Sequence, residues 1–381
     1  VSRIIWRESQ LREGILTKTQ FGLAAVFLCT SALTASAAGI ERSAPSTRIL
    51  FEDGAYFELS ASIANPSLSG EGGLLATGST GDLLKTFATF GVAYKGDLND
   101  RVSYALILGN PWGVDTLYPD RAGSLYGGTE ASLDSYSLTG ILSYDITQNI
   151  KAYAGVVGQY IEADAAFPFA PALGFPGAYS VDAEGDFGFG LMGGVAYERP
   201  EIALRVALTY YSEIDHTLST TETVGAASFD DKTDITTPQS VNLDFQTGVA
   251  ANTLVFGQIR WVDWSDFAIA PPIFTTGVGA PLVDYEEDWW TYTLGVGQRF
   301  NENWSGAVQA SYEPQTDTVL TTLGPIDGRV TLGLSATYEF DNTKITGGLS
   351  YTMLGDAENF AGTQYDDGSV FGAGVRVGWS F

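Results

Sequence analysis

Apolar and polar residues alternate with a period of two over most of the chain beyond residue 54. At the C-terminal end, Val375, Val377 and Trp379 interleave with Arg376 and Gly378. This alternation is typical of a β-strand with one apolar and one polar face. We identify fourteen such stretches, at residues 57–63, 90–94, 102–108, 136–144, 152–160, 187–197, 202–210, 241–245, 255–261, 290–296, 304–312, 330–340, 345–353 and 375–381.

The connections between these stretches also alternate, between short and long. The six short ones are residues 96–100, 145–149, 198–201, 250–252, 301–303 and 341–343. The seven long ones are roughly residues 65–85, 110–130, 162–186, 212–237, 268–289, 314–328 and 355–369. Short turns at one end, long loops at the other and aromatic residues at the strand ends predict an all-β fold, a 14-stranded antiparallel transmembrane β-barrel. A soluble β-sandwich or propeller is the alternative, because its strands alternate too.

The composition of the chain limits which ligands and which catalytic groups can be expected. The 381 residues include 45 glycines and carry a net charge of −26, which excludes nucleic acid as a natural partner. The single cysteine is Cys29 and the single histidine is His216, so disulfides, thiol nucleophiles and cysteine metal sites are not expected. No cofactor is implied.

The first residues are typical of a secretory signal peptide. Lys18 precedes an apolar run over residues 21–33, and Ala35-Ser36-Ala37 supplies small residues for cleavage. We interpret residues 1–17 as an N-terminal extension that results from a gene start assigned too far upstream. We expect a signal peptide at 1–37, a short N-terminal plug at 38–53 and the barrel at 54–381, located in the outer membrane.

Several stretches together resemble the FadL-type outer-membrane transporters of long-chain fatty acids and other hydrophobic compounds (OMPP1/FadL/TodX). They are Asn110-Pro111-Trp112-Gly113 with Tyr118, Thr236-Thr237-Pro238 with Asn242-Leu243, Trp261–Phe267 and Tyr292–Trp304. The resemblance implies passive transport of a hydrophobic compound such as a long-chain fatty acid, contact with outer-membrane lipid and lipopolysaccharide, and assembly by the barrel insertion machinery. We expect a monomer. The sequence departs from the family at its front, where an Asn-Pro-Ala motif often begins a long hatch; here Asn65-Pro66 follows the first strand.

A fatty-acid site needs an apolar pocket with cations or donors at its mouth. Five apolar residues at inward positions could line such a pocket or pack against the plug: Ile107, Ile141, Met192, Leu254 and Phe256. Seven arginines are candidates to grip a carboxylate bidentately: Arg42 and Arg48 in the plug, and Arg205, Arg260, Arg299, Arg329 and Arg376 at inward strand positions. The alternative role of these arginines is an ion-pair network with Glu58, Asp244, Glu313 and Glu339.

The third strand carries the candidate for a lateral opening, at Gly109, Asn110, Pro111, Trp112 and Gly113. Pro111 cannot donate to a β-ladder, and glycines tolerate bends. The family resemblance implies that this segment kinks inward and lets substrate leave sideways into the bilayer. An ordinary loop start is the alternative.

The loops offer two further features. Acidic groups at Asp230-Asp231, Glu286-Glu287-Asp288 and Asp366-Asp367 are either solvated charge or sites for divalent cations that bridge to lipopolysaccharide. Phe167, Phe169, Phe175, Ile273 and Phe274 are expected to form an exposed groove for first capture.

Three other functions stay open. The first is a general diffusion porin for small polar solutes. The second is a lipid hydrolase or acyltransferase that uses Ser212, Asp215 and His216, and the third is a surface receptor or structural barrel.

Overall fold

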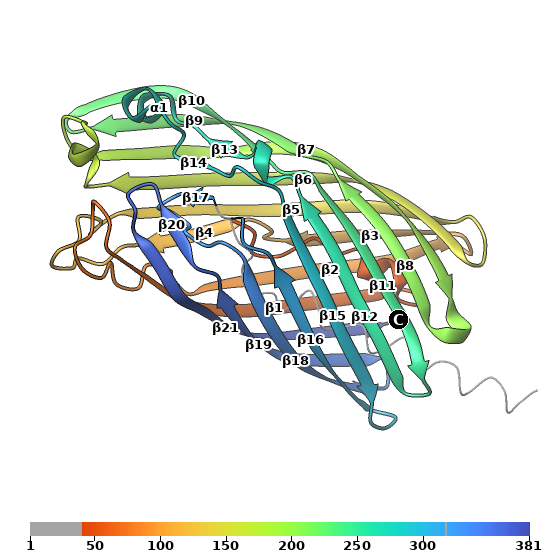
Figure 1. Ribbon diagram of the computed structural model, residues 1–381. Coiled ribbons are helices and arrows are strands. Elements are labelled where there is room, and N and C mark those ends of the chain that lie inside the picture. Colours follow the sequence, from red (N-terminus) through yellow and green to blue (C-terminus); the bar gives the residue numbers. More distant parts are fainter. Residues whose placement is uncertain (1–39, 317) are drawn as a thin grey trace, which may run out of the picture.

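The computed structural model describes residues 40–316 and 318–381, which form one closed antiparallel β-barrel (Figure 1). The expected signal peptide lies outside these residues. The predicted count of 14 strands is confirmed. Several of them are interrupted and carry two labels. In chain order, with interrupted strands joined by a plus sign, the wall consists of β1 (Tyr56–Glu71), β2 (Phe87–Asn99), β3 (Val102–Gly109) + β4 (Gly113–Leu117), β5 (Glu130–Asp145), β6 (Ile150–Phe167), β7 (Tyr179–Arg199), β8 (Leu204–Tyr211) + β9 (Ile214–Val224), β10 (Ala227–Thr237) + β11 (Ser240–Ala250), β12 (Thr253–Val262), β15 (Trp289–Arg299), β16 (Trp304–Glu313), β18 (Arg329–Phe340), β19 (Thr343–Leu354) and β21 (Gln364–Ser380).

The last strand closes the barrel onto the first. Tyr56 is paired with Ser380 and Ala64 with Gly372 in an antiparallel ladder. The ring of Phe57 stacks on that of Trp379, with centroids 5.7 Å apart. The alternating C-terminal stretch therefore removes the free edges that an open sheet would expose to lipid.

The apolar face of the strands points outward. Leu138, Leu142, Leu294, Val308 and Leu334 are all exposed on the outer surface. Inward neighbours are mostly polar or small, such as Ser143 and Thr337, and they are buried. Aromatic side chains lie near the strand ends, where Trp304 packs on Tyr338 across β16 and β18. This is the arrangement of a wall with lipid outside and a polar lumen inside.

One predicted loop is wrong. Residues 212–237 mostly continue the wall as the β9–β10 hairpin, whose ladder runs from Ile214–Thr237 to Val224–Ala227. Its outward residues, among them Asp215, Thr217 and Asp234, are polar, whereas inward Leu218 and Ile235 are buried. In this hairpin the apolar residues point into the barrel and the polar residues point outward, the reverse of the lipid-facing strands. A search for strands with apolar residues on the outer face therefore does not detect it.

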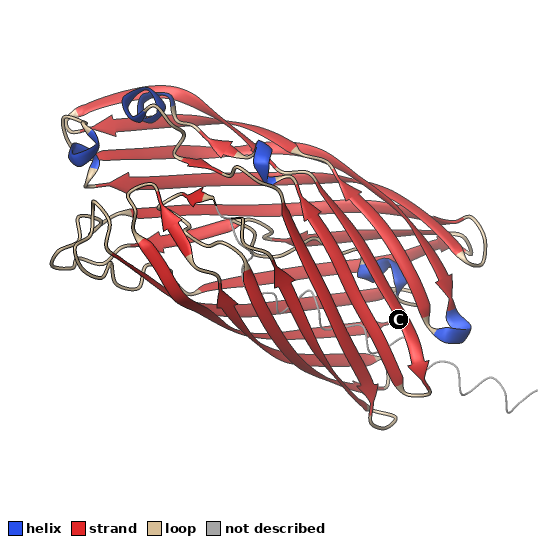
Figure 2. Ribbon diagram, in the orientation of Figure 1, coloured by secondary structure: helices blue, strands red, loops and turns tan. Residues whose placement is uncertain are grey.

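The smaller elements gather at the end that carries the long loops, which we name the loop end (Figures 1 and 2). They are η3 (Ala170–Leu173), η5 (Trp264–Asp266), β13 (Ala268–Ile269), α1 (Pro272–Val278), β14 (Val283–Asp284), β17 (Val319–Leu320) and β20 (Ala357–Asn359). The opposite end, which we name the turn end, carries short connections and η4 (Pro200–Ile202), and η2 (Arg48–Phe51) precedes the barrel in the chain. Among the residues described, none of the helices is long and apolar enough to cross a membrane.

The two faces of one strand provide a test of the lipid boundary. Leu334 is 60 % exposed near the centre of β18, where it is paired with Val308 and Leu349. Ser335 follows it on the lumen side. We expect Leu334→Arg to lower the free energy of unfolding in lipid vesicles by about 2–4 kcal/mol, because it places a charge in hydrocarbon.

Ser335→Arg is the matched control, and it should cost clearly less. Denaturant titration of both variants in vesicles measures the difference. Equal costs would show that the outer face of β18 does not lie in lipid.

Candidate transport site

Residues 40–54 lie against the inner wall of the barrel, and charged groups fix them at several places. Arg42 pairs with Asp115 of β4 and Asp134 of β5, each at 2.7 Å. Glu41 pairs with Arg260 of β12, Nη2 to Oε1 2.5 Å. The segment is therefore tied to walls that face each other across the lumen.

Further along, the segment binds the strands near the closure. Arg48 donates to Glu58 of β1 at 2.5 Å, and Arg376 of β21 lies 3.1 Å from the same carboxylate. Glu52 accepts from Lys344 of β19 at 2.9 Å. Because these charges are mostly removed from water, breaking one partner would leave the other uncompensated.

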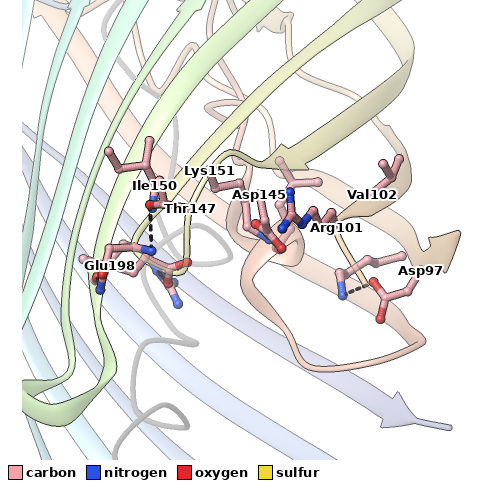
Figure 3. Close-up of polar contacts among 12 residues, drawn as sticks. Asp97, Arg101, Val102, Asp145, Thr147, Ile150, Lys151 and Glu198 are labelled. Carbon is pink, nitrogen blue, oxygen red and sulfur yellow. Dashed lines mark hydrogen bonds and ion pairs between the residues drawn. The ribbon is translucent and has the colours of Figure 1, made fainter. Parts of the chain in front are cut away.

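Towards the turn end, lysines bind the backbone of the same segment. Lys151 donates to the carbonyl of Leu50 at 3.2 Å, and its Nζ lies 3.4 Å from Asp145 Oδ1 (Figure 3). Lys95 donates to the carbonyl of Gly54 and to Asp97. The guanidinium carbon of Arg205 lies 4.0 Å from the ring centroid of Phe51.

The predicted interruption of the third strand is present. β3 ends at Gly109, opposite Ser137 of β5, and β4 begins at Gly113, opposite Asp134. Three residues of one strand thus face two of the other, and the ladder to β2 stops at Gly91. The side chain of Asn110 replaces part of that ladder, since it accepts from Phe90 N at 3.0 Å and donates to Ala88 O at 3.3 Å.

The N-terminal segment covers this break from inside. The amides of Arg42 and Ser43 donate to the carbonyl of Pro111 at 2.7 and 3.0 Å, and Gly113 N donates to Ile40 O at 2.6 Å. A β-carbon at Gly113 would overlap the guanidinium of Arg42, so a larger residue there would displace Arg42 from its two aspartates. Backbone hydrogen bonds therefore join the N-terminal segment directly to the interrupted part of the third strand.

The five apolar lumen candidates do point inward, but they are already packed. Ile141 and Met192 are buried in a cluster with Ile49 and Leu50, and Ile107 packs against its edge. Leu254 and Phe256 form a separate cluster with Ala203 and Ala307. Most of the predicted apolar lining therefore serves to seat the N-terminal segment.

The remaining arginines are dispersed. Arg329 pairs with Glu313 at 3.5 Å and Arg205 with Glu198 at 2.9 Å. Arg299 lies at the turn end, where it donates to the carbonyls of Asn301 and Glu302. Asp244 accepts from Gln258 at 2.8 Å. Apart from Arg48 and Arg376, which share Glu58, the candidate arginines are thus spread along the barrel.

An apolar pocket lies at the loop end, at a place that the sequence reasoning missed. Ile40 and Val114 line one side of it, and Leu133, Val181 and Ile235 line the strand wall. Val283, Tyr285 and Leu323 from the loops also line it. The sequence pattern that could have revealed this pocket is the one described for the β9–β10 hairpin. Beyond the lipid, the inward residues of the strands are apolar and the outward ones are polar.

The predicted exposed capture groove is wrong. Phe167, Phe169, Phe175 and Phe274 are each at most 9 % exposed and pack on one another and on Tyr179. Ile273 is half-buried beside them. Loop aromatics can pack together as a small core, and here they pack with helix α1 at the loop end in a cluster that we name the lid.

A buried carboxylate holds helix α1 in this lid. Glu222 of β9 is fully buried and accepts from Ile273 N at 2.9 Å, Phe274 N at 2.8 Å and the Tyr179 hydroxyl at 2.8 Å. These donors satisfy both of its oxygens at the first turn of the helix.

Hydrogen bonds join three other loops. The Tyr118 hydroxyl donates to Thr322 O at 2.7 Å and lies 2.8 Å from the Tyr365 hydroxyl, while Asn359 donates to Tyr126. Burial raises the pKa of Tyr118 well above its ordinary value, so this hydroxyl remains a donor.

The hydrolase candidates have other partners. The Ser212 hydroxyl is bonded to Leu191 N and Glu213 O, whereas His216 Nε2 lies 3.0 Å from Gln159 Oε1. Asp215 accepts from Thr236. Within residues 40–316 and 318–381 no group of three or more His, Cys, Asp or Glu side chains could hold a metal ion.

The Glu222 contact allows a direct test. Glu222→Gln keeps one acceptor oxygen and puts an amide NH₂ against a donor, which should cost about 1–3 kcal/mol locally. We expect faster hydrogen exchange at the amides of Ile273 and Phe274 with the barrel intact. Glu201→Gln, at the exposed turn end, is the control. Unchanged exchange in Glu222→Gln would show that this carboxylate does not hold the lid.

Comparison with known proteins agrees with this geometry. The structure is similar to a Pseudomonas aeruginosa FadL homologue with a TM-score of 0.74 and 14 % identity, covering 88 % of this chain and 92 % of that one. It is also similar to the Pseudomonas putida toluene transporter TodX (0.64, 15 %, covering 92 % and 97 %) and the Ralstonia pickettii toluene transporter TbuX (0.62, 15 %, covering 92 % and 97 %). At these identities the likeness shows the fold alone.

No curated protein sequence matches the chain. The profile of one family, described as outer membrane protein transport protein (OMPP1/FadL/TodX), matches residues 55–371. That span covers most of the chain and nearly the whole barrel. The protein therefore belongs to the OMPP1/FadL/TodX family of outer-membrane transport proteins, and it is located in the outer membrane.

Proposed function

We propose that the protein is a passive transporter of hydrophobic compounds, such as long-chain fatty acids or aromatic hydrocarbons, and that it releases them sideways at the third strand. The observation that carries the proposal is the contiguity of the apolar pocket with the wall break. Ile40 and Val114 line the pocket, and Ile40 is bonded to Gly113 at the edge of the break. A molecule in the pocket is thus one residue layer from the interruption.

The polar lumen supports release through the wall over passage down the barrel. Below the pocket, the way to the turn end is occupied by residues 40–54 with their ion pairs and hydrogen bonds. An apolar molecule gains free energy on entering lipid and gains nothing among these charges. On this basis we propose that residues 40–53, the described part of the predicted segment 38–53, act as a plug in the barrel of residues 54–381.

Arg42 is our candidate for the residue that links substrate to opening. It contacts both Asp115 and Asp134 beside the break and lies under Gly113. Arg42 does not line the pocket itself, but it is two residues from Ile40, which does. A carboxylate that leaves the pocket towards the break would compete with the two aspartates for the guanidinium, and an uncharged hydrocarbon would not, so this contact is our candidate for the preference between fatty acids and hydrocarbons.

The uptake experiment uses cells that lack their own transporter. We expect the protein to confer uptake of labelled oleate, labelled toluene or both, and Pro111→Ala to reduce it. An alanine at 111 restores a backbone N–H and the freedom to continue the ladder, which favours a closed wall. Pro200→Ala, at the turn end, is the matched control and should leave uptake unchanged.

Uptake that is the same in Pro111→Ala and in the parent would contradict release at the third strand. Absence of uptake of either compound, together with leakage of small sugars, would identify a general diffusion porin instead.

A further inference from the structure

A second interruption of the wall lies between β7 and the β8–β9 pair. β7 is paired with β9 from Tyr179 to Glu184 and with β8 from Met192 to Arg199. The seven residues 185–191 have no ladder partner on this side. We name this stretch, with the facing residues 212–218, the β7 seam.

Hydrogen bonds join the two sides of the β7 seam at its ends, and two of them use side chains. Ser212 N donates to Leu191 O and Ser212 Oγ accepts from Leu191 N, both at 2.9 Å. Thr217 N donates to Asp186 Oδ2 at 3.1 Å. A register shift between β6 and β7 lies at the loop-end side of the seam, where Ile161 faces Asp186 and Ala163 faces Ala183. Such a bulge bends a strand and frees it from its neighbour.

Glycines in β7 leave room for side chains of β9 beneath them. A β-carbon at Gly188 would lie 2.5 Å from Ile214 Cγ2 and 2.8 Å from His216 Cε1, and one at Gly190 would lie 2.7 Å from Ile214 Cγ1. His216 crosses under β7 to reach Gln159 of β6, Nε2 to Oε1 3.0 Å. Ile214 and His216 therefore close the seam from the lumen side.

Two aromatic side chains on the outer side of the seam are more exposed than others of their kind on the wall. Phe187 and Phe189 are 70 and 75 % exposed, compared with 42 % for Phe90 on β2 and 50 % for Phe371 on β21, and Leu191 beside them is 64 % exposed. On the inner side, Ile235 is paired with His216 in the β9–β10 ladder and lines the apolar pocket. One layer of side chains thus separates the pocket from apolar groups that face lipid.

We propose that the β7 seam is a second lateral passage, through which apolar ligands move between the loop-end pocket and the outer leaflet, with Ile214 and His216 as its gate. The proposal rests on the proposed function of the pocket, and it is independent of the break in the third strand. Ile214 gives the gate an apolar side, and the His216 ring is held by Gln159 and lies 3.6 Å from Asp186 Oδ2, so the gate suits an uncharged hydrocarbon or an acyl chain better than a charged head group.

A disulfide across the seam tests the proposal. An ideal β-carbon at Gly190 lies 3.0 Å from Ser212 Oγ, so the pair Gly190→Cys and Ser212→Cys is placed to cross-link after a small shift of Ile214. Cys29 is the only native cysteine. Uptake of labelled toluene and oleate is measured in oxidised and in reduced cells, and heat-modifiable gel migration verifies the barrel.

We expect oxidation of the double variant to lower uptake and a reductant to restore it, and the two single-cysteine variants to be insensitive to both. Ile214→Ala should raise uptake. The loss on oxidation should also appear in a Pro111→Ala background, because the two passages are separate.

Uptake that oxidation leaves unchanged in a cross-linked variant would overturn the β7 seam as a passage. A pair that does not cross-link would overturn it as well if Ile214→Ala also transports like the parent. If the parent chain takes up neither probe, the proposed function itself fails, and this result is distinct from both others.

Discussion

The structure depends on one constraint: inside hydrocarbon, every backbone N–H and C=O group needs a partner within the protein. The β1–β21 ladder meets this constraint by joining the two ends of the sheet. The wall can be interrupted only where other groups supply the missing hydrogen bonds. Side chains supply part of the missing hydrogen bonds at both interruptions, Asn110 at one and Ser212 and Asp186 at the ends of the other.

The same constraint explains how the N-terminal segment is bound. At the third strand its backbone takes over part of the missing pairing, through Pro111 O and Gly113 N. Its charged side chains are mostly buried, and they then need partners within the protein. Glu41, Arg42, Arg48 and Glu52 find them on opposite sides of the barrel. The residues that bind the N-terminal segment to the lumen wall therefore lie in the same short segment as those that pair with the interrupted third strand.

Much of the fold could be predicted from the sequence, because a period of two and the alternation of turn lengths are local signals. The strand count was accessible in this way, whereas the segment Gly109–Gly113 was singled out from Pro111, its flanking glycines and the family resemblance. The β9–β10 hairpin was not, since its inward residues Leu218 and Ile235 become apolar where its outward residues become polar. The loop-end pocket was missed for the same reason. The burial of Phe167 and Phe274 depends on contacts between distant loops, and no local pattern encodes these. The inward direction of Arg260 could be predicted from parity, but its pairing with Glu41, 219 residues away, could not.

The central claim is that residues 40–54 close the lumen to water, so that apolar compounds have to leave through the wall. Ion conductance of the purified protein in planar lipid bilayers tests this most directly, with a variant lacking residues 40–53 as the open reference. We predict no steady conductance for the intact chain and a stable conducting state for the variant. A large, steady conductance through the intact chain would contradict the account, because it would show a continuous aqueous path along the barrel.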